Sequence, residues 1–160
     1  MPPAAFHMPH SSPKIMMSPT RTELVALARS AAAQHSLDAA LVCAIAEQES
    51  SWEPFAIRYE PAFRTRYVAP LGLAPTEEVA RSISWGLMQV MGQVAREHEF
   101  TGKFLSALCD PAMGIEMGCR VFAAKLADAS GDTARGLQLW NGGANPDYAT
   151  QVLARVSAYQ

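Results

Sequence analysis

The sequence predicts a mostly α-helical domain with room for a short β-hairpin around residues 65–90. Composition and helical spacing support this fold class. The chain has 160 residues, 49% of them apolar and 18% charged, and a chain of this length buries roughly 70% of its unfolded surface without help from disulfides or metals. From Thr20 onward apolar residues recur at helical spacing, and residues that favour helix starts precede most of these segments.

Two parts of the chain differ in composition. Residues 1–18 are expected to form a flexible N-terminal arm, and residues 19–160 to form the folded domain. The arm is rich in Pro, Ser and Met, and it lacks the basic start and apolar run of a signal peptide. We therefore expect synthesis and folding in the cytoplasm. No apolar stretch of the sequence reaches the roughly 18 residues needed for a membrane span.

The first helices are predicted from local signals. Thr20 and Glu23 match a capping box, in which each side chain accepts a hydrogen bond from the backbone of the other. Ser36 is expected to cap a second helix that runs to about Ser50 and is apolar almost all round, as a central buried helix would be. The apolar stripe of the first helix consists of Leu24, Leu27, Ala28 and Ala31.

The middle of the chain is expected to be irregular, because four prolines lie between Trp52 and Ser82. A short helix after Thr76 is the exception. Asp110 and Pro111 then supply an N-cap and a first-turn proline for a long helix. The apolar residues of this helix are Ile115, Cys119, Phe122 and Leu126.

Two further helices follow. Gly131 ends the long helix, and Asp132 caps a helix that reaches Trp140. Asn145 and Pro146 repeat the helix-start signal for the last helix. Its inward residues are expected to be Ala149, Val152, Leu153 and Val156.

Charge and cysteine content exclude several classes of function. The formal charge of −2 comes from 13 basic and 15 acidic side chains, which excludes the basic surface needed for nucleic-acid binding. The three cysteines lack metal-ligand spacing. Cys43 and Cys119 lie among alanines and aliphatic residues, where a thiol usually acts as a small buried apolar group.

Glu49 is a candidate general acid. It shares a helical face with Val42 and Ile45, and partial burial there would favour its neutral form and raise its pKa. The alternative is a solvated glutamate at a frayed helix end. Glu47 is equally eligible on local grounds, so periodicity does not choose between them.

Three ordered blocks resemble the soluble lytic transglycosylase family, lysozyme-like enzymes of the goose-type lysozyme superfamily that cleave peptidoglycan. Residues 44–56, AIAEQESSWEPFA, resemble the family's catalytic helix with its Glu-Ser pair, here Glu49 and Ser50. Residues 84–91, SWGLMQVM, resemble its Gly-Leu-Met-Gln segment, and residues 139–143, LWNGG, resemble its Ala-Tyr-Asn-x-Gly block, followed by a tyrosine at Tyr148.

The resemblance implies a lysozyme-like single domain and a reaction that uses one carboxyl group. Glu49 would protonate the glycosidic oxygen between N-acetylmuramic acid and N-acetylglucosamine. It would then deprotonate the 6-hydroxyl, which closes a 1,6-anhydro ring. Most glycosidases use two carboxylates, but here the acetamido group of the substrate would stabilise the reacting centre. No metal or organic cofactor is implied.

The resemblance also implies a set of substrate-binding residues: Ser50, Ser84, Met88, Gln89, Trp140, Asn141 and Tyr148. Each has a purely structural alternative. Met88 can be a core residue and Gln89 a surface amide, while Ser84 can cap a local turn. Asn141 can orient substrate or Glu49, or belong to an ordinary Asn-Gly-Gly turn. Tyr148 can donate to the acid or simply pack beside Val152.

The sequence departs from the family pattern at two places. Trp140 replaces a tyrosine, so a contact made through that hydroxyl must be absent or supplied elsewhere. The segment of residues 53–83 is longer than usual for the family. Its aromatic and basic residues could form a rim that binds sugars and carboxylates, or a solvated loop packed by its own aromatics. They are Arg58, Tyr59, Phe63, Arg64, Arg66 and Tyr67.

The expected partner is the glycan strand of peptidoglycan. The alternatives are a hydrolytic muramidase with the same site, as in goose-type lysozymes, and a non-catalytic glycan-binding module. A wall-acting protein made without a signal peptide needs a route out of the cytoplasm. Assembly into a phage particle, holin-assisted lysis and a secretion machine all fit, and the compact size favours a phage or prophage origin.

Overall fold

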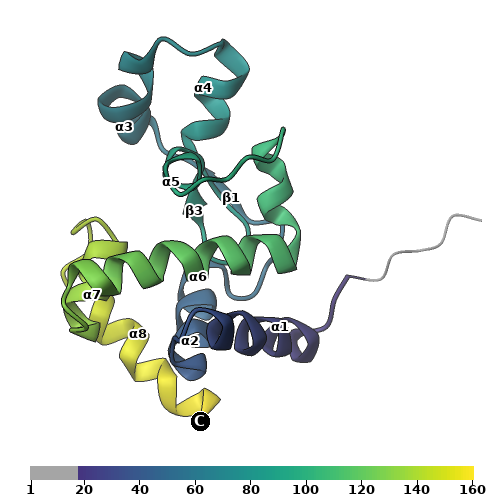
Figure 1. Cartoon of the computed structure of the whole chain (residues 1–160), viewed down its shortest axis with the longest axis vertical. Helices are drawn as coiled ribbons and strands as arrows, with labels where there is room; N and C mark the ends of the chain where they lie inside the picture. Colours follow the sequence, from purple (N-terminus) through teal and green to yellow (C-terminus); the bar gives the residue numbers. More distant parts are fainter. Residues whose placement is uncertain (1–17) are drawn as a thin grey trace, which may run out of the picture.

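The structure, a computed structural model, describes residues 18–160, so nearly all of the expected N-terminal arm lies outside the described residues. One long helix crosses the middle of the molecule (Figure 1). Within the described residues the longer helices are α1 (Arg21–Gln34), α2 (Ala39–Ser50), α6 (Pro111–Asp128), α7 (Thr133–Trp140) and α8 (Tyr148–Val156).

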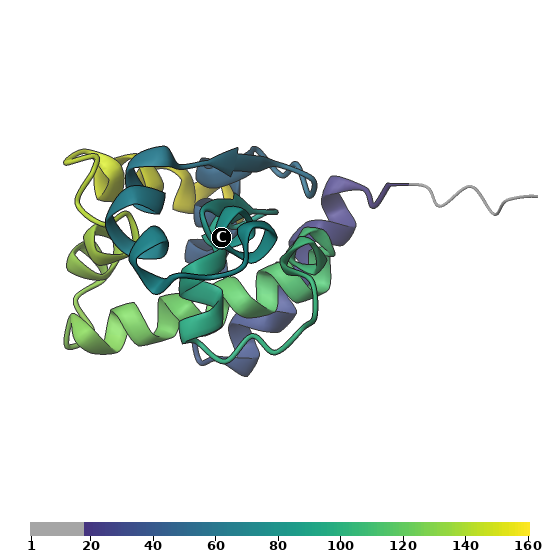
Figure 2. The same ribbon diagram turned by 90° about the horizontal axis from the view of Figure 1, so that it is seen from above.

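Three of the longer helices lie on one side of α6, and a small sheet lies on the other. In the view of Figure 1, α1, α2 and α8 lie below α6, whereas the sheet and the shorter helices lie above it. Seen from above in Figure 2, α6 runs along one side of the molecule and the segment around residue 57 along the other. We call the part above α6, residues 57–109, the upper lobe.

The capping box at the start of α1 is confirmed. The amide of Thr20 donates to Glu23 Oε2 (2.7 Å), and the amide of Glu23 donates to Thr20 Oγ1 (3.3 Å). The buried stripe, however, consists of Leu24, Ala28, Ala31 and Ala32. Leu27, expected in the core, is 36% exposed, because it lies at the edge of the face that the i, i+4, i+7 and i+8 positions form.

The predicted cap of α2 is wrong by two residues. Asp38 caps the helix, since its Oδ1 accepts a hydrogen bond from the amide of Leu41 (2.8 Å). Ser36 instead has a left-handed backbone (φ 56°) in the turn that closes α1, where the amide of Leu37 donates to the carbonyl of Ala32. The predicted end of α2 at Ser50 is confirmed.

The expected hairpin is part of a three-stranded antiparallel sheet. The strands are β1 (Ile57–Tyr59), β2 (Ile83–Trp85) and β3 (Val90–Met91), in that order across the sheet. Arg58 pairs with Ser84, which in turn pairs with Met91 on its other side. The β2–β3 hairpin lies within the expected residues 65–90 apart from Met91, and β1 was not expected.

Residues 61–81 are mostly helical rather than irregular. Pro61 and Pro75 each occupy the first turn of a helix, where proline lacks only an amide that would be unpaired anyway. The short helix predicted after Thr76 is therefore confirmed as α4. The short helical elements of the upper lobe are α3 (Pro61–Phe63), η1 (Arg64–Val68), η2 (Ala69–Leu71), α4 (Pro75–Arg81), α5 (Gly92–Glu97) and η3 (Leu105–Cys109).

The predicted starts of α6 and α7 are confirmed. Asp110 Oδ1 accepts from the amide of Met113, and Asp132 Oδ1 from the amide of Arg135. The last helix begins at Tyr148, later than predicted, because the Asn145 side chain accepts from the amide of Asp147 and forms a turn before the helix.

The C-terminal residues cover part of the core. Val152 is fully buried, whereas Leu153, also expected inside, is 43% exposed. A short helix, η4 (Ser157–Tyr159), follows α8 and packs on α2. The core joins α2, α6, α7 and α8, and among its fully buried members are Ile45, Phe122 and Leu137.

Cys43 and Cys119 are both buried and free, as predicted.

Candidate active site

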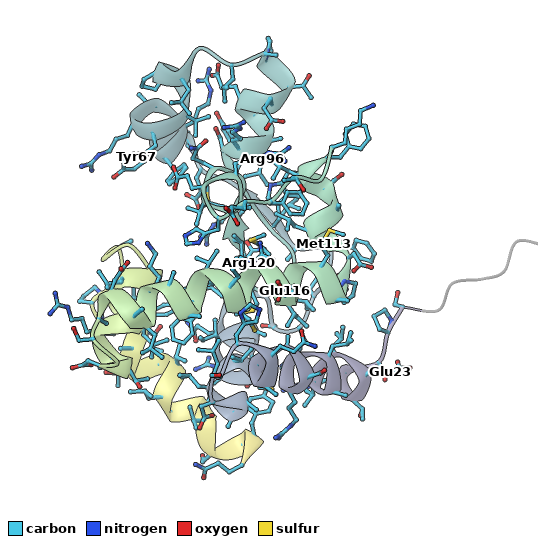
Figure 3. All side chains as sticks on the ribbon, in the orientation of Figure 1. Glu23, Tyr67, Arg96, Met113, Glu116 and Arg120 are labelled. Carbon is cyan, nitrogen blue, oxygen red and sulfur yellow. The ribbon has the colours of Figure 1, made fainter. Side chains whose placement is uncertain are left out.

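A cavity of about 480 Å³ lies between the upper lobe and the helices α2, α6 and α7. Its walls combine aromatic, charged and polar side chains from both sides. Tyr67, labelled in Figure 3, belongs to the upper lobe. The charged lining residues are Glu49, Arg58, Glu60 and Lys125. The aromatic and polar lining residues are Phe63, Tyr67, Ser84, Gln89, Trp140 and Asn141.

Glu49 reaches the cavity from the last turn of α2. Its Oε1 accepts two hydrogen bonds, one from Trp140 Nε1 (2.8 Å) and one from the Tyr148 hydroxyl (2.5 Å). The two donors come from the end of α7 and the start of α8. The fold thus brings Glu49 to two residues that lie 91 and 99 positions further along the chain.

Burial raises the pKa of Glu49 above its ordinary value. The hydrogen bonds from Tyr148 and Trp140 and the positive charge of Arg58 act in the opposite direction, and desolvation outweighs them. The direction of the shift is the one expected from the apolar face of α2. A carboxyl group of this kind keeps its proton closer to neutral pH than an exposed glutamate does.

Glu47, the other eligible carboxylate of α2, lies in a different environment. Desolvation acts to raise its pKa, but hydrogen bonds from Arg21 and Tyr159 hold the pKa below its usual value. Arg21 Nη2 lies 2.7 Å from Glu47 Oε1. Glu47 is therefore kept as a carboxylate by an ion pair outside the cavity, whereas Glu49 lines the cavity.

Trp140 and Tyr148 are held firmly. The indole ring of Trp140 contacts the buried ring of Phe122 edge to face, with ring centroids 5.9 Å apart. Tyr148 is 4% exposed, and burial together with the charge of Glu49 raises the pKa of its hydroxyl. The hydroxyl therefore remains a protonated donor.

Ser84 and Gln89 line the cavity, but their polar groups bond mainly to each other and to the backbone. Ser84 Oγ donates to Gln89 Oε1 (2.9 Å), and Gln89 Nε2 donates to the carbonyls of Ala56 and Gly86. Gly86 has φ 67°, and a Cβ there would lie 2.3 Å from the carbonyl oxygen of Leu108. This segment is thus a rigid turn that requires glycine.

Three residues of the predicted binding set, Met88, Ser50 and Tyr148, do not line the cavity. Met88 is fully buried and packs against Gly118, where a Cβ would lie 2.3 Å from the methionine Sδ. The expectation that Met88 borders the cleft is therefore wrong, and Met91 lines the cavity instead. The Ser50 hydroxyl donates to the carbonyl of Leu87 (2.8 Å) and so ties α2 to the turn.

Asn141 ends α7 and lines the cavity. Its Nδ2 donates to the carbonyl of Asn145 (3.3 Å) rather than to Glu49. The side chain thus holds the loop after α7.

The aromatic and basic residues of the 53–83 segment divide into two groups. Arg58, Phe63 and Tyr67 line the cavity. The ring centroids of Phe63 and Tyr67 lie 4.9 Å apart. Arg64 instead forms an ion pair with Glu78. The segment thus forms one wall of the cavity.

Sequence reasoning missed Glu60 and Lys125. Glu60 Oε1 pairs with Arg58 Nε (2.5 Å). Lys125 lies one helical turn after Val121, and both line the cavity. This spacing is readable in the sequence, but nothing in it shows that this face of α6 borders a cavity.

Residues 18–160 contain no group of three or more His, Cys, Asp or Glu side chains arranged to hold a metal ion. In the same part of the chain, no helix combines the length and apolar character needed to cross a bilayer.

Comparisons with known proteins agree with this architecture. The crystal structure of the Burkholderia AP3 phage endolysin is similar, with a TM-score of 0.61 and 21% sequence identity over 84% of this chain and 69% of that one. A search of curated protein sequences gave no match. A sequence profile of the transglycosylase SLT domain matches residues 26–155. The expected mostly α, lysozyme-like fold is thereby confirmed, and the chain belongs to the transglycosylase SLT family of peptidoglycan lytic enzymes.

Proposed function

We propose that the protein cleaves the β-1,4 bond between N-acetylmuramic acid and N-acetylglucosamine and forms a 1,6-anhydro product, with Glu49 as acid and then base. The observation that carries this proposal is the environment of Glu49. It is a desolvated carboxyl group with a raised pKa, it lines the cavity, and two donors hold one of its oxygens.

In the first step Glu49 donates its proton to the glycosidic oxygen. The bond from this oxygen to C1 of the muramyl sugar breaks, and its electron pair stays on the oxygen that receives the proton. Glu49 becomes a carboxylate, which the hydrogen bonds from Trp140 and Tyr148 stabilise. A raised pKa suits this step because the acid must still be protonated when substrate binds.

In the second step the carboxylate of Glu49 takes the proton of the 6-hydroxyl. The oxygen of that hydroxyl forms a bond to C1 and closes the 1,6-anhydro ring, so the original protonation state returns without a net gain of water. The other carboxylate of the cavity, Glu60, is paired with Arg58. We therefore assign stabilisation of C1 to the substrate's acetamido group rather than to a second acid.

Substrate contacts are proposed for the residues on the two cavity walls. Phe63 and Tyr67 offer ring faces to sugars, and Asn141 offers its amide to an acetamido group. Ser84 and Gln89 shape the floor, since their polar groups are used within the turn. Ser50 and Met88 support the site from behind.

Digestion of purified sacculi followed by mass spectrometry of the muropeptides tests the reaction. We expect products that lack one water at the muramyl end. Glu49→Gln keeps the size and both acceptor contacts but cannot transfer a proton, so it should reduce turnover by at least about a thousandfold. Glu47→Gln is the matched control and should remain active.

The rival functions give different results in the same experiment. Reducing-end sugars in place of anhydro products would identify a hydrolytic muramidase with the same site. Equal background turnover by the unmodified protein and Glu49→Gln would identify a non-catalytic glycan-binding module. Either result would overturn the proposed reaction.

We also propose a setting in phage-induced lysis, one of the three routes to the cell wall that the sequence leaves open. The fold similarity to a protein described as a phage endolysin supports this choice. Expression in bacteria with a holin should cause lysis, whereas expression alone should not. Lysis that does not depend on a holin would contradict this setting.

A further inference from the structure

The indole of Trp140 differs in its hydrogen bonding from the tyrosine of the family pattern. An indole N–H can donate a hydrogen bond but has no acceptor, whereas a phenolic hydroxyl can do both. Trp140 Nε1 donates to Glu49 Oε1 over 2.8 Å. This oxygen must therefore act as an acceptor whether or not the carboxyl group carries its proton.

Tyr148 occupies the second acceptor position of the same oxygen. Its hydroxyl donates to Glu49 Oε1 over 2.5 Å. With both lone pairs of Oε1 engaged, the proton of the neutral acid belongs on Oε2. Within the described residues, Oε2 makes no hydrogen bond, and Glu49 lines the cavity.

We propose that Trp140 is a positioning residue that keeps Oε1 an acceptor in both protonation states and thereby places the transferable proton of Glu49 on Oε2. This inference rests on the proposed function of Glu49 as acid and base. It makes Oε2 the atom that delivers the proton to the glycosidic oxygen and later receives the proton of the 6-hydroxyl. One oxygen then serves both half-reactions, and the carboxyl group need not rotate between them.

The packing of Trp140 fixes this arrangement. Its ring contacts Phe122, which is fully buried in α6, at an interplanar angle of 80°. The amide of Asn141, the next residue, donates to the carbonyl of Leu137 and closes α7 at this point. The donor therefore approaches Oε1 from a rigid helix end, as a preorganised site requires.

Other charged or titratable side chains lie near Glu49. They must be left unchanged when the pH profile of a Trp140 variant is measured. Tyr148 faces it from α8, Arg58 and Glu60 share the cavity from the upper lobe, and Lys125 from α6. Of these, Arg58 lowers the pKa of Glu49 through its charge. A variant at Trp140 leaves all four in place.

The sharpest test changes only the donor. Replacing Trp140 by benzothienylalanine puts sulfur in place of the indole N–H and keeps the bicyclic shape, and Trp140→Phe is its genetically simple counterpart. Turnover of sacculi is measured against pH for both. We expect kcat to fall about ten- to a hundredfold, because a charge-assisted hydrogen bond is lost in the reacting state. The alkaline limb of kcat/KM should move to higher pH, because the carboxylate loses a donor.

Two further variants separate positioning from packing. Trp140→Tyr restores a donor and should recover part of the rate and of the pH profile. Trp85→Phe removes another buried indole N–H, which donates to the carbonyl of Ala80 outside the cavity, and it should leave the pH profile unchanged.

The outcomes distinguish this inference from the proposed function. An alkaline limb that stays in place in both Trp140 variants, with only a lower plateau, would reduce Trp140 to a packing residue and overturn the inference. If Glu49→Gln is inactive in the same assay and the unmodified protein releases anhydro products, the proposed function stands regardless. If Glu49→Gln retains full activity, the proposed function itself fails.

Discussion

Tyr148, the first residue of α8, donates a 2.5 Å hydrogen bond to Oε1 of Glu49 in the last turn of α2. The bond links two helices that pack against each other. Burial raises the pKa of the tyrosine hydroxyl, so at neutral pH it remains a donor. The contact therefore favours the charged form of Glu49 against the desolvation that opposes it.

Tyr148→Phe should lower kcat about ten- to a hundredfold, because the carboxylate formed after proton donation loses a donor. The pKa of Glu49 should rise for the same reason, and the alkaline limb of kcat/KM should move to higher pH. Tyr59→Phe is the control, since Tyr59 is 47% exposed and does not line the cavity. An unchanged rate in Tyr148→Phe would contradict a role in catalysis.

Glu49→Gln should stabilise the protein at neutral pH. The folded-state pKa of Glu49 lies above its unfolded value, so between these values the folded state binds more protons and the free energy of unfolding falls as the pH rises. Above both values the folded protein carries the full cost of a buried carboxylate, which a neutral glutamine avoids.

Thermal unfolding followed by circular dichroism at about pH 4 and about pH 8 checks this difference. The melting temperature of Glu49→Gln should exceed that of the unmodified protein by more at the higher pH than at the lower. A gain that is equal at both pH values would show that the effect does not come from ionisation of Glu49.

Local signals predicted most helices but not their contacts. The capping box at Thr20 and the aspartate caps at Asp110 and Asp132 form because each side chain reaches an amide within three residues. Ser36 and Asp38 are both good caps within one short turn, and the chain reversal after α1 decides between them. Residue preference alone could not make that choice.

In the candidate site, too, local patterns predicted single residues but not the contacts between them. Periodicity placed Glu49 on the apolar face of α2, but its partners Trp140 and Tyr148 are 91 and 99 residues away. Met88 and Met91 are both apolar and close in sequence, and the turn that begins at Gly86 sends one into the core and the other to the cavity. Such outcomes depend on tertiary packing, which no local pattern contains.

Phe63→Ala and Tyr67→Ala should raise the KM for glycan strands about tenfold each and leave kcat within about twofold. Each ring lines the cavity and makes no hydrogen bond to Glu49, and loss of a sugar-stacking face costs about 1–1.5 kcal/mol of binding. Phe55→Ala is the control, because Phe55 is 65% exposed and does not line the cavity. Equal KM values for all three variants would show that the upper lobe does not bind the glycan.

Tyr159→Phe should lower the free energy of unfolding by about 1–3 kcal/mol. The Tyr159 hydroxyl accepts from Trp52 Nε1 (2.8 Å) and Arg21 Nη2 (2.9 Å), and donates to Glu47 Oε2 (2.9 Å). Removing it leaves the buried indole N–H of Trp52 without this partner.

The backbone conformation of Trp52 adds to the loss of unfolding free energy expected for Tyr159→Phe. Its φ is 68°, in the left-handed region that non-glycine residues rarely adopt, and it directly follows Ser51, with φ 52°. The hydrogen bond that Trp52 Nε1 donates to Tyr159 and the burial of the indole hold this costly backbone in place. Urea unfolding of Tyr159→Phe beside Tyr59→Phe measures the effect. Tyr59→Phe should stay within about 0.5 kcal/mol of the unmodified protein, and a loss of the same size in both variants would contradict the stabilising role of Tyr159.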